Sequence, residues 1–401
     1  MRPFQHTRIL LGVTGGIACY KSIWLARLLT QAGAQVDVVM TRGAREFVGP
    51  ITFEAVTGRP VSTDIFGAGH ALDHIRLARE ANAILIAPAT ADFIARAAHG
   101  QADDLLSAIL LAATCPVMMA PAMNDRMWAH VQTQANVARL REIGYTIIDP
   151  DNGPLAVGEG EGPGRLPEPD VLLAHFARLV EPNQSLRGAR VIVTAGATRE
   201  PIDPVRFMSN HSTGKMGIAL AAAAWRRGAD VTLVAGHVDV PLPSGVRIQR
   251  VDTTEEMADV VRAALPTTDV LIMAAAPADY RAAELSGRKL KKDGMTRTLA
   301  LSETPDILRT TIADRAPGMT VVGFALETHD AVEYARGKLV DKQLDLVIAN
   351  QAGVQGEGFG ADTNRVTLVD RTGRTEALPL QSKRDVAEHV WDRVEALRHG
   401  R

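Results

Sequence analysis

Short apolar stretches alternate with longer, partly polar stretches along the first half of the chain. The short stretches lack a polar face and end at Gly, Pro or polar residues, which is typical of strands buried on both sides of a parallel sheet. We predict strands at residues 9–13, 35–40, 83–87 and 117–119, and helices at 18–31 and 103–113. Because helical crossovers separate the strands, the pattern predicts a parallel, doubly wound sheet.

The same pattern restarts in the second half. It predicts strands at 190–194, 230–234 and 270–274, a turn at 196–198 and a helix at 217–227. The two halves also correspond in detail, because ILLGVTGG matches VIVTAGAT and ILIAPAT matches LIMAAAPADY. The predicted fold class is therefore α/β, with two doubly wound, Rossmann-like domains.

A Gly- and Pro-rich stretch, DPDNGPLAVGEGEGPGR at 149–165, interrupts the pattern. We expect it to hold neither helix nor strand for long, and interpret it as a linker or a mobile flap over a site. The polar segment 181–188 is the predicted boundary between domains at 1–183 and 184–401. The longest apolar stretch, 107–123, is interrupted by Pro116 and is interpreted as a helix end and a buried strand, not a membrane span.

Composition narrows the class of partner. The 401 residues are 46% apolar but only 4% aromatic, and the net charge is −2. No basic stripe is visible, so small-molecule chemistry is favoured over nucleic-acid binding. The two cysteines, Cys19 and Cys115, lie in apolar contexts and predict neither a disulfide framework nor a metal site. The apolar stretch at 9–13 is too short for a signal peptide, so we expect a cytoplasmic protein.

The segment LGVTGGI, at 11–17, joins a strand to a helix. Its glycines allow a tight turn, and free amides at the helix start can hold a phosphate, although a plain βα turn would look the same. The second strand ends at Thr41-Arg42 with no acidic residue to bind a dinucleotide ribose. The hydroxyl of Thr41 and the guanidinium of Arg42 suit a phosphate monoester better than a dinucleotide ribose.

Two further loops, at 87–92 and 120–124, follow buried strands and should meet the first turn at the carboxyl edge of the sheet. Asn124 could bind a substrate carboxylate or amide, or could simply cap the next helix. His74 is the most interesting ionisable group of this half, although it could equally be a surface or core histidine.

The motifs GVTGGIACYK, DHIRLA, APATADFIA and PAMNDRMW resemble those of flavin-dependent phosphopantothenoylcysteine decarboxylases, in order as well as in wording. The resemblance implies a flavodoxin-like domain with FMN, His74 as the catalytic base and Asn124 on the substrate carboxylate. It also implies the cofactor-binding residues Gly15, Gly16, Ile17, Thr41 and Thr90.

One position departs from that family. Its flap commonly reads LACGE, in which the cysteine donates a proton, whereas this chain has Val157 in LAVGE. Another group or water must then protonate the product, with Glu159 as one candidate, or the reaction stops at an oxidised product. FMN can supply the electron sink for CO₂ loss by oxidising the neighbouring CH₂–SH.

The second half carries its own polar motifs. REPIDPVRFMSNHSTGKMG, at 199–217, gathers amides, hydroxyls and a lysine that suit oxyanions, unless it is only a loop capping the next helix. Asp279 follows a strand and could hold a base or Mg²⁺, or cap a turn. The run RKLKK at 288–292 is either a solvated face or a cationic site. Lys338 and Lys342 share a helix face, as expected if a triphosphate lay between them.

TAGATREPIDPVR, SNHSTGKMG, AAAPADYR, KLKK, ETPDIL and GFALET resemble bacterial, CTP-using phosphopantothenate–cysteine ligases. The resemblance implies Mg²⁺ and an acyl-cytidylate intermediate on which Asn210 acts. The resemblance of the whole chain implies a homo-oligomer whose flavin site is shared between neighbouring N-terminal domains. The CTP-binding residues that it implies are Asp279, Lys289, Pro305, Asp306, Ile307, Leu308, Phe324, Lys338 and Lys342.

The leading hypothesis is a bifunctional enzyme of coenzyme A biosynthesis, because the product of the ligase is the substrate of the decarboxylase. Its substrates would be 4'-phosphopantothenate, L-cysteine and CTP, with no nucleic-acid or membrane partner. One alternative is an active ligase whose N-terminal domain is an incomplete decarboxylase or a regulatory flavoprotein, because of Val157. Another is a nicotinamide-dependent oxidoreductase, although the dinucleotide fingerprint is absent.

Overall fold

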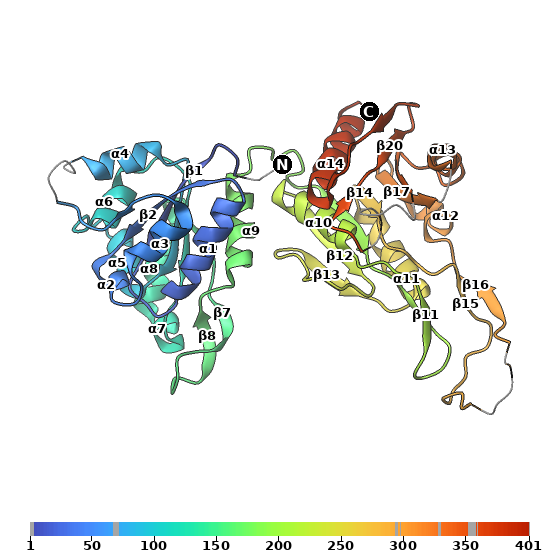
Figure 1. Cartoon of the computed structure of the whole chain (residues 1–401), viewed down its shortest axis with the longest axis horizontal. Coiled ribbons are helices and arrows are strands. Elements are labelled where there is room, and N and C mark those ends of the chain that lie inside the picture. Colours follow the sequence, from blue (N-terminus) through green and yellow to red (C-terminus); the bar gives the residue numbers. More distant parts are fainter. Residues whose placement is uncertain are drawn as a thin grey trace. The chain divides into compact units, whose positions relative to one another are not determined.

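The structure is a computed structural model that describes residues 4–66, 72–292, 296, 298–327, 330–351, 358 and 360–400. Two compact units divide the chain, Arg2–Pro182 and Asn183–Arg401. Helices cover both faces of a central sheet in each unit (Figure 1). Among the described residues, no helix is long and apolar enough to cross a membrane.

The first unit is built on a six-stranded sheet of order β3-β2-β1-β4-β5-β6, and each recorded pair of neighbours is parallel. Without the two-residue β3, the order is that of flavodoxin-like folds. The strands are β1 (Arg8–Val13), β2 (Gln35–Met40), β3 (Val61–Ser62), β4 (Ala83–Ala89), β5 (Val117–Pro121) and β6 (Thr146–Ile147), followed by the separate pair β7 (Asp151–Pro154) and β8 (Glu161–Arg165). The helices are α1 (Cys19–Gln31), α2 (Arg42–Arg45), α3 (Pro50–Thr57), α4 (Asp73–Glu80), α5 (Ala91–Ala98), α6 (Leu105–Ala112), α7 (Asp125–Ala129), α8 (Val131–Glu142) and α9 (Pro169–Val180).

Alternate residues of β1 supply two different cores. Ile9 and Leu11 pack into the core that includes α1 and α9, whereas Leu10 packs on the opposite face with α5 and α6. Both faces of the strand are therefore buried, which is why its sequence is continuously apolar. The predicted parallel sheet is confirmed.

The second unit is built on an eight-stranded sheet of order β13-β12-β9-β14-β17-β18-β20-β21, in which β20 and β21 pair antiparallel. Its six parallel strands have the order of a Rossmann fold. The sheet contains β9 (Arg190–Ala195), β12 (Asp230–Ala235), β13 (Arg247–Arg250), β14 (Val270–Met273), β17 (Thr320–Glu327), β18 (Leu346–Gln351), β20 (Thr367–Asp370) and β21 (Thr375–Ala377). The helices are α10 (Lys215–Arg226), α11 (Thr254–Ala264), α12 (Ile307–Thr310), α13 (Ala331–Asp341) and α14 (Lys383–His399), with short 3₁₀ turns at Leu265–Thr267 and Ile312–Asp314.

Small two-stranded pairs complete this unit and lie outside its main sheet. They are β10 (Arg199–Pro201) with β11 (Phe207–Ser209), β15 (Tyr280–Ala282) with β16 (Leu301–Glu303), and β19 (Thr363–Asn364) with β22 (Gln381–Ser382). The first two pairs project from the sheet (Figure 1).

Two sequence-based expectations need correction. The flap at 149–165 was expected to hold neither helix nor strand for long, but β7 and β8 form an antiparallel hairpin there, with strands of four and five residues. Two glycines of β8, Gly162 and Gly164, pack closely on a neighbouring loop, as described below. The loop at 199–217 likewise contains β10 and β11, and α10 begins at Lys215, two residues before the predicted start.

Candidate functional site

The turn after β1 lies at the point of the first sheet where the strand order reverses, between β1 and β4. Thr14 ties the loops that follow these two strands together. Its hydroxyl donates to the Pro88 carbonyl at 2.8 Å and accepts from the Thr90 amide at 3.0 Å. Ligands of open α/β sheets bind in the crevice at this point, so the first candidate site is here.

Gly15 approaches the backbone of α2 so closely that no side chain would fit. A Cβ atom on Gly15 would lie 2.7 Å from the carbonyl carbon of Gly43. Within the part of the chain that the structure describes, the amides of Gly15, Gly16 and Ile17 have no backbone hydrogen-bond partner. These half-buried or exposed donors precede α1, which suits an anionic group such as a phosphate.

The other two predicted cofactor residues lie at the same edge as helix caps. Thr41 begins α2, where its hydroxyl accepts from the Ala44 amide at 3.4 Å, and its own amide donates to the Val13 carbonyl at 3.1 Å. Thr90 begins α5 and accepts from the Phe93 amide at 3.2 Å. The structure thus brings all five predicted cofactor residues to the carboxyl ends of β1, β2 and β4.

Asn124 follows β5 and caps α7, because its Oδ1 accepts from the Arg126 amide at 2.9 Å. The hairpin β7–β8 packs against this loop. The Met123 amide donates to the Gly164 carbonyl at 3.0 Å, and a Cβ on Gly164 would lie 2.1 Å from the Met123 carbonyl oxygen. Gly164 is therefore required by close contact with the loop that carries Asn124.

Val157 lies in the turn between β7 and β8 with its side chain fully exposed. The turn is closed by hydrogen bonds from the Leu155 amide to the Gly160 carbonyl and from the Glu159 amide to the Ala156 carbonyl. Glu159, two residues beyond Val157, is exposed. This chain therefore presents an apolar group at the flap tip, with a carboxylate beside it.

His74 is the second residue of α4 and is half-buried. At the other end of this helix, Glu80 pairs with Arg8 at the start of β1, 2.8 Å from its Nη2. Because the C-terminal end of α4 meets the amino edge of the sheet, its N-terminal end with His74 is directed toward the carboxyl edge. The preceding residues 67–71 lie outside the described part of the chain.

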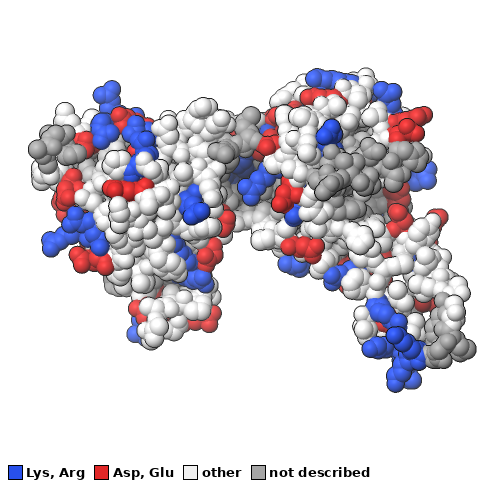
Figure 2. All heavy atoms as spheres, viewed as in Figure 1, with Lys and Arg blue, Asp and Glu red and all other residues white. Residues whose placement is uncertain are grey.

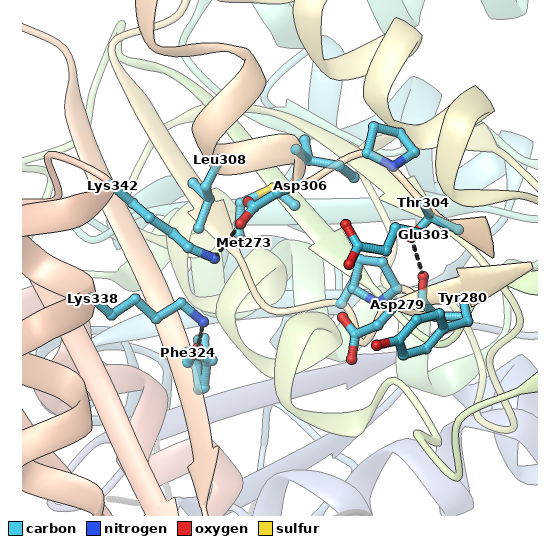
Figure 3. A pocket seen from close by; sticks show the side chains of 15 residues that line it. Met273, Asp279, Tyr280, Glu303, Thr304, Asp306, Leu308, Phe324, Lys338 and Lys342 are labelled. Carbon is cyan, nitrogen blue, oxygen red and sulfur yellow. Dashed lines mark hydrogen bonds and ion pairs between the residues drawn. The ribbon is translucent and has the colours of Figure 1, made fainter. Parts of the chain in front are cut away.

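The second candidate site is a cavity of about 310 Å³ on the sheet of the second unit (Figure 3). Its walls come from the segment after β14, from residues 303–308, from β17 and from α13. The lining includes the predicted residues Asp279, Pro305, Asp306, Ile307, Leu308, Phe324, Lys338 and Lys342. Residues from distant parts of the sequence therefore converge on one cavity.

Two lysines face this cavity from the same side (Figure 3). The Lys342 ammonium lies 2.7 Å from Oδ2 of Asp306, and the Lys338 ammonium donates to the Phe324 carbonyl at 2.5 Å. Burial alone would raise the pKa of Asp306, but the hydrogen bond and charge of Lys342 outweigh it and lower the pKa. Asp306 also caps α12 through the Arg309 amide, at 3.2 Å. The cavity thus combines cations with a fixed carboxylate.

A buried polar frame, which the sequence reading missed, holds the loop beside the cavity. The Thr198 hydroxyl accepts from the Ala278 amide at 2.9 Å and bonds to the Thr254 hydroxyl at 2.9 Å. Glu200 is 3% exposed and accepts from both the amide and the hydroxyl of Thr254. Thr198 and Glu200 stand in the TAGATREP motif, but no local pattern reveals a partner more than fifty residues away.

The remaining two predicted residues of the second unit, Asn210 and Lys289, differ in their position relative to the cavity. Asn210 reaches the loop after β14, because its Nδ2 donates to the carbonyl groups of Ala276 at 3.2 Å and Pro277 at 3.0 Å. Lys289 is exposed and is not among the residues that line the cavity. Tyr280, Glu303, Thr304 and Met273 line it without having been predicted.

The described residues contain no group of three or more His, Cys, Asp or Glu side chains that could hold a metal ion. A divalent cation at this cavity would need ligands from a bound phosphate chain as well as from a carboxylate. Mg²⁺ commonly binds in that way, through one or two carboxylates and substrate phosphates. The carboxylates of Asp279, Glu303 and Asp306 line the cavity.

Both halves of the chain match known families. The "Flavoprotein" family model matches residues 2–181, and the "DNA/pantothenate metabolism flavoprotein C-terminal domain" model matches residues 186–397. The chain is similar to the coenzyme A biosynthesis bifunctional protein CoaBC of Vibrio vulnificus, with 45% identity over 99% of both chains. It is 44% identical to the CoaBC protein of Mycobacterium bovis over 96% of both.

A search of solved structures also finds the crystal structure of the C-terminal domain of a CoaBC protein. That domain is 34% identical to this chain, with a TM-score of 0.47, and the match covers 54% of this chain and 100% of the domain.

Proposed function

The chain belongs to the family of bifunctional coenzyme A biosynthesis flavoproteins, and we propose that it joins 4'-phosphopantothenate to L-cysteine with CTP and decarboxylates the product with FMN. It is a bifunctional enzyme with a ligase half and a decarboxylase half. The observation that carries the proposal is the 45% identity that extends over 99% of this chain and of its relative, across both family domains.

The cavity of the second unit is the proposed ligase site. A carboxylate oxygen of 4'-phosphopantothenate attacks the α-phosphorus of CTP, forming an acyl cytidylate and releasing pyrophosphate. The amine of cysteine then attacks the acyl carbon and CMP leaves. Lys338 and Lys342 would counter the charge that develops on the phosphates. Asp279 would be a ligand for Mg²⁺, which would neutralise part of the same charge.

Asn210 supports this assignment from the side of the cavity. Its two hydrogen bonds to the carbonyl groups of Ala276 and Pro277 fix its side chain against the loop that leads to Asp279. We propose that the amide orients the acyl intermediate for attack by the amine, because positioning of the reacting groups lowers the barrier.

The edge at β1 and β4 is the proposed flavin site. The amides of Gly15, Gly16 and Ile17, which have no backbone hydrogen-bond partner among the described residues, fit a phosphate monoester, with the hydroxyls of Thr41 and Thr90 at the same edge. When bound, FMN would accept two electrons from the CH₂–SH group, which turns that group into an electron sink, and would later return the two electrons to the decarboxylated product. His74 takes the substrate proton and Asn124 holds the carboxylate that is lost.

Replacing Gly15 with alanine is expected to release the flavin. The new Cβ would lie 2.7 Å from the Gly43 carbonyl carbon, so the turn must move away from α2. Gly43→Ala is the matched control, because its Cβ would lie 3.4 Å from the nearest atom, the Gly15 Cα, which is an ordinary contact. The flavin absorbance retained by each purified variant measures the effect. Equal retention by both variants would contradict the assignment of this turn.

We also propose a homo-oligomer. Ile17, Tyr20 and Trp24 on or beside α1, and Phe47 and Ile51 near α3, expose 49–71% of their surface. A single chain leaves this apolar surface in water, whereas contact with a second copy would bury it. Lys289, a proposed CTP-binding residue, is also not among the residues that line the cavity of the second unit in the same chain. Light scattering of the purified protein should give a multiple of the 43.0 kDa chain mass.

The ligase proposal has a direct test. Pyrophosphate release from CTP should require 4'-phosphopantothenate. Repeated turnover should also require L-cysteine, because its amine removes the acyl cytidylate. The absence of pyrophosphate with all three substrates would remove the ligase function from this chain.

The proposed cytoplasmic location follows from the substrates, and cell fractionation tests it.

A further inference from the structure

The strands β15 and β16 form the root of an arm that extends away from the sheet of the second unit (Figure 1). Its root borders the ligase cavity through Tyr280 and Glu303. Lys and Arg side chains gather near the far end of this arm (Figure 2), where the sequence reads Arg288-Lys289-Leu290-Lys291-Lys292. In the described part of the structure, no hydrogen bond or ion pair is recorded for the Lys289 ammonium.

The ion pair of Asp203 and Arg206 binds both the backbone amide and the backbone carbonyl of Leu290. The Leu290 amide donates to Oδ2 of Asp203 at 3.1 Å, and the Leu290 carbonyl accepts from Nη2 of Arg206 at 2.6 Å. Asp203 and Arg206 also bond to each other through Nε, at 2.9 Å, and Nη2, at 2.5 Å. A second link joins the same segments, from the Ser286 amide to the Ile202 carbonyl at 3.2 Å.

The Asp203 carboxylate accepts further hydrogen bonds within its own turn. It accepts from the amides of Val205 at 2.8 Å and Arg206 at 2.9 Å, and the Asp203 side chain is 0% exposed. The hydrogen bonds from Arg206 outweigh desolvation and hold the pKa of Asp203 well below its usual range. The carboxylate therefore stays ionised at neutral pH.

We propose that Asp203 is a positioning residue for the ligase reaction, which acts through Arg206 and the Leu290 peptide to set the place of Lys289. The inference rests on the proposed ligase function, in which Lys289 binds CTP. A flexible lysine on a projecting arm would lose much entropy on binding a phosphate chain. Fixing both polar groups of the next peptide removes part of that cost before the substrate arrives, which is preorganisation.

A double-mutant cycle with Asp203→Asn and Lys289→Ala tests the proposal. The asparagine amide cannot accept all of these hydrogen bonds. We expect Asp203→Asn to lower kcat/KM for CTP about 10- to 100-fold in the wild-type background, the range for losing a charge-assisted hydrogen bond. In the Lys289→Ala background its effect should fall close to onefold. The same fold loss in both backgrounds, or no loss in the wild type, would overturn the proposal.

Two further variants separate positioning from general damage. Glu255→Gln removes an ion pair at the root of the arm, 2.7 Å from Glu255 Oε2 to Arg281 Nη1, without touching Leu290, and should retain activity. Arg206→Lys keeps the charge, but a single ammonium cannot reproduce the fork that bonds both Asp203 and Leu290. It should show the same coupling to Lys289, which keeps the test available if Asp203→Asn does not fold.

The rate of tryptic cleavage of the full chain tests this contact without a measurement of enzyme activity. Asp203→Asn should be cut faster than wild type after the basic residues 288–292, and Glu255→Gln should not. Equal rates for Asp203→Asn and wild type would contradict the restraint of the arm. Failure of wild-type protein to release pyrophosphate would instead contradict the proposed function, and the cleavage rates would still decide whether the contact restrains the arm.

Discussion

Replacing Lys338 with alanine is expected to lower kcat/KM for CTP by about 100- to 1,000-fold, the range for removing one group that stabilises developing negative charge. Lys338 lines the cavity proposed as the ligase site, where its ammonium donates to the Phe324 carbonyl. Without it, the phosphates would lose a positioned cation. Pyrophosphate release at varied CTP concentration measures the effect.

Arg309→Ala is the matched control for this prediction. It removes a neighbouring cation that pairs with Asp341 at 2.9 Å, but Arg309 does not line the cavity. We expect it to retain ligase activity within about twofold, as is usual for exposed ion pairs. Lys338→Ala should still decarboxylate phosphopantothenoylcysteine that is supplied directly. Unchanged kcat/KM in Lys338→Ala would contradict the placement of the phosphates.

The second large effect is expected for His74→Asn, which should lower the rate of decarboxylation by about 100- to 10,000-fold, as for the loss of a general base. His74 lies at the end of α4 that is directed toward the proposed flavin edge. Asparagine keeps a similar size but cannot accept the proton. Carbon dioxide release from supplied phosphopantothenoylcysteine measures the effect, and flavin absorbance shows that the cofactor is still bound.

An exposed histidine at the end of α5 provides the comparison for His74. His99→Asn should leave decarboxylation unchanged, since His99 caps the far end of a helix that begins at Thr90. His74→Asn should also keep the full rate of pyrophosphate release. A His74→Asn variant that decarboxylates normally would remove His74 from the chemistry.

The sequence predicted the central strands well because burial on both faces leaves a continuous apolar pattern. The segment predicted at 35–40 coincides with β2, and that at 9–13 lies within β1. The hairpin β7–β8 could not be predicted in this way. Gly164 reflects close packing on the Met123 backbone, a contact between distant residues, rather than an absence of regular structure.

The candidate sites were accessible from the sequence to different degrees. Resemblance placed Asp306, Phe324 and Lys342 in one binding site, and the structure brings them to one cavity. It could not show that Lys289 lies on a projecting arm, or that Asp203 and Arg206 hold the next peptide. Such contacts join segments more than eighty residues apart and depend on backbone groups, which every residue carries.

The most direct test of the account is the product formed when the purified chain receives 4'-phosphopantothenate, L-cysteine and CTP. Mass spectrometry should find 4'-phosphopantetheine, with one CO₂ and one pyrophosphate for each molecule formed. Accumulation of phosphopantothenoylcysteine would contradict the decarboxylase half, and accumulation of the oxidised enethiol would show that Val157 leaves the flap without a proton donor. Release of neither pyrophosphate nor CO₂ would contradict the account as a whole.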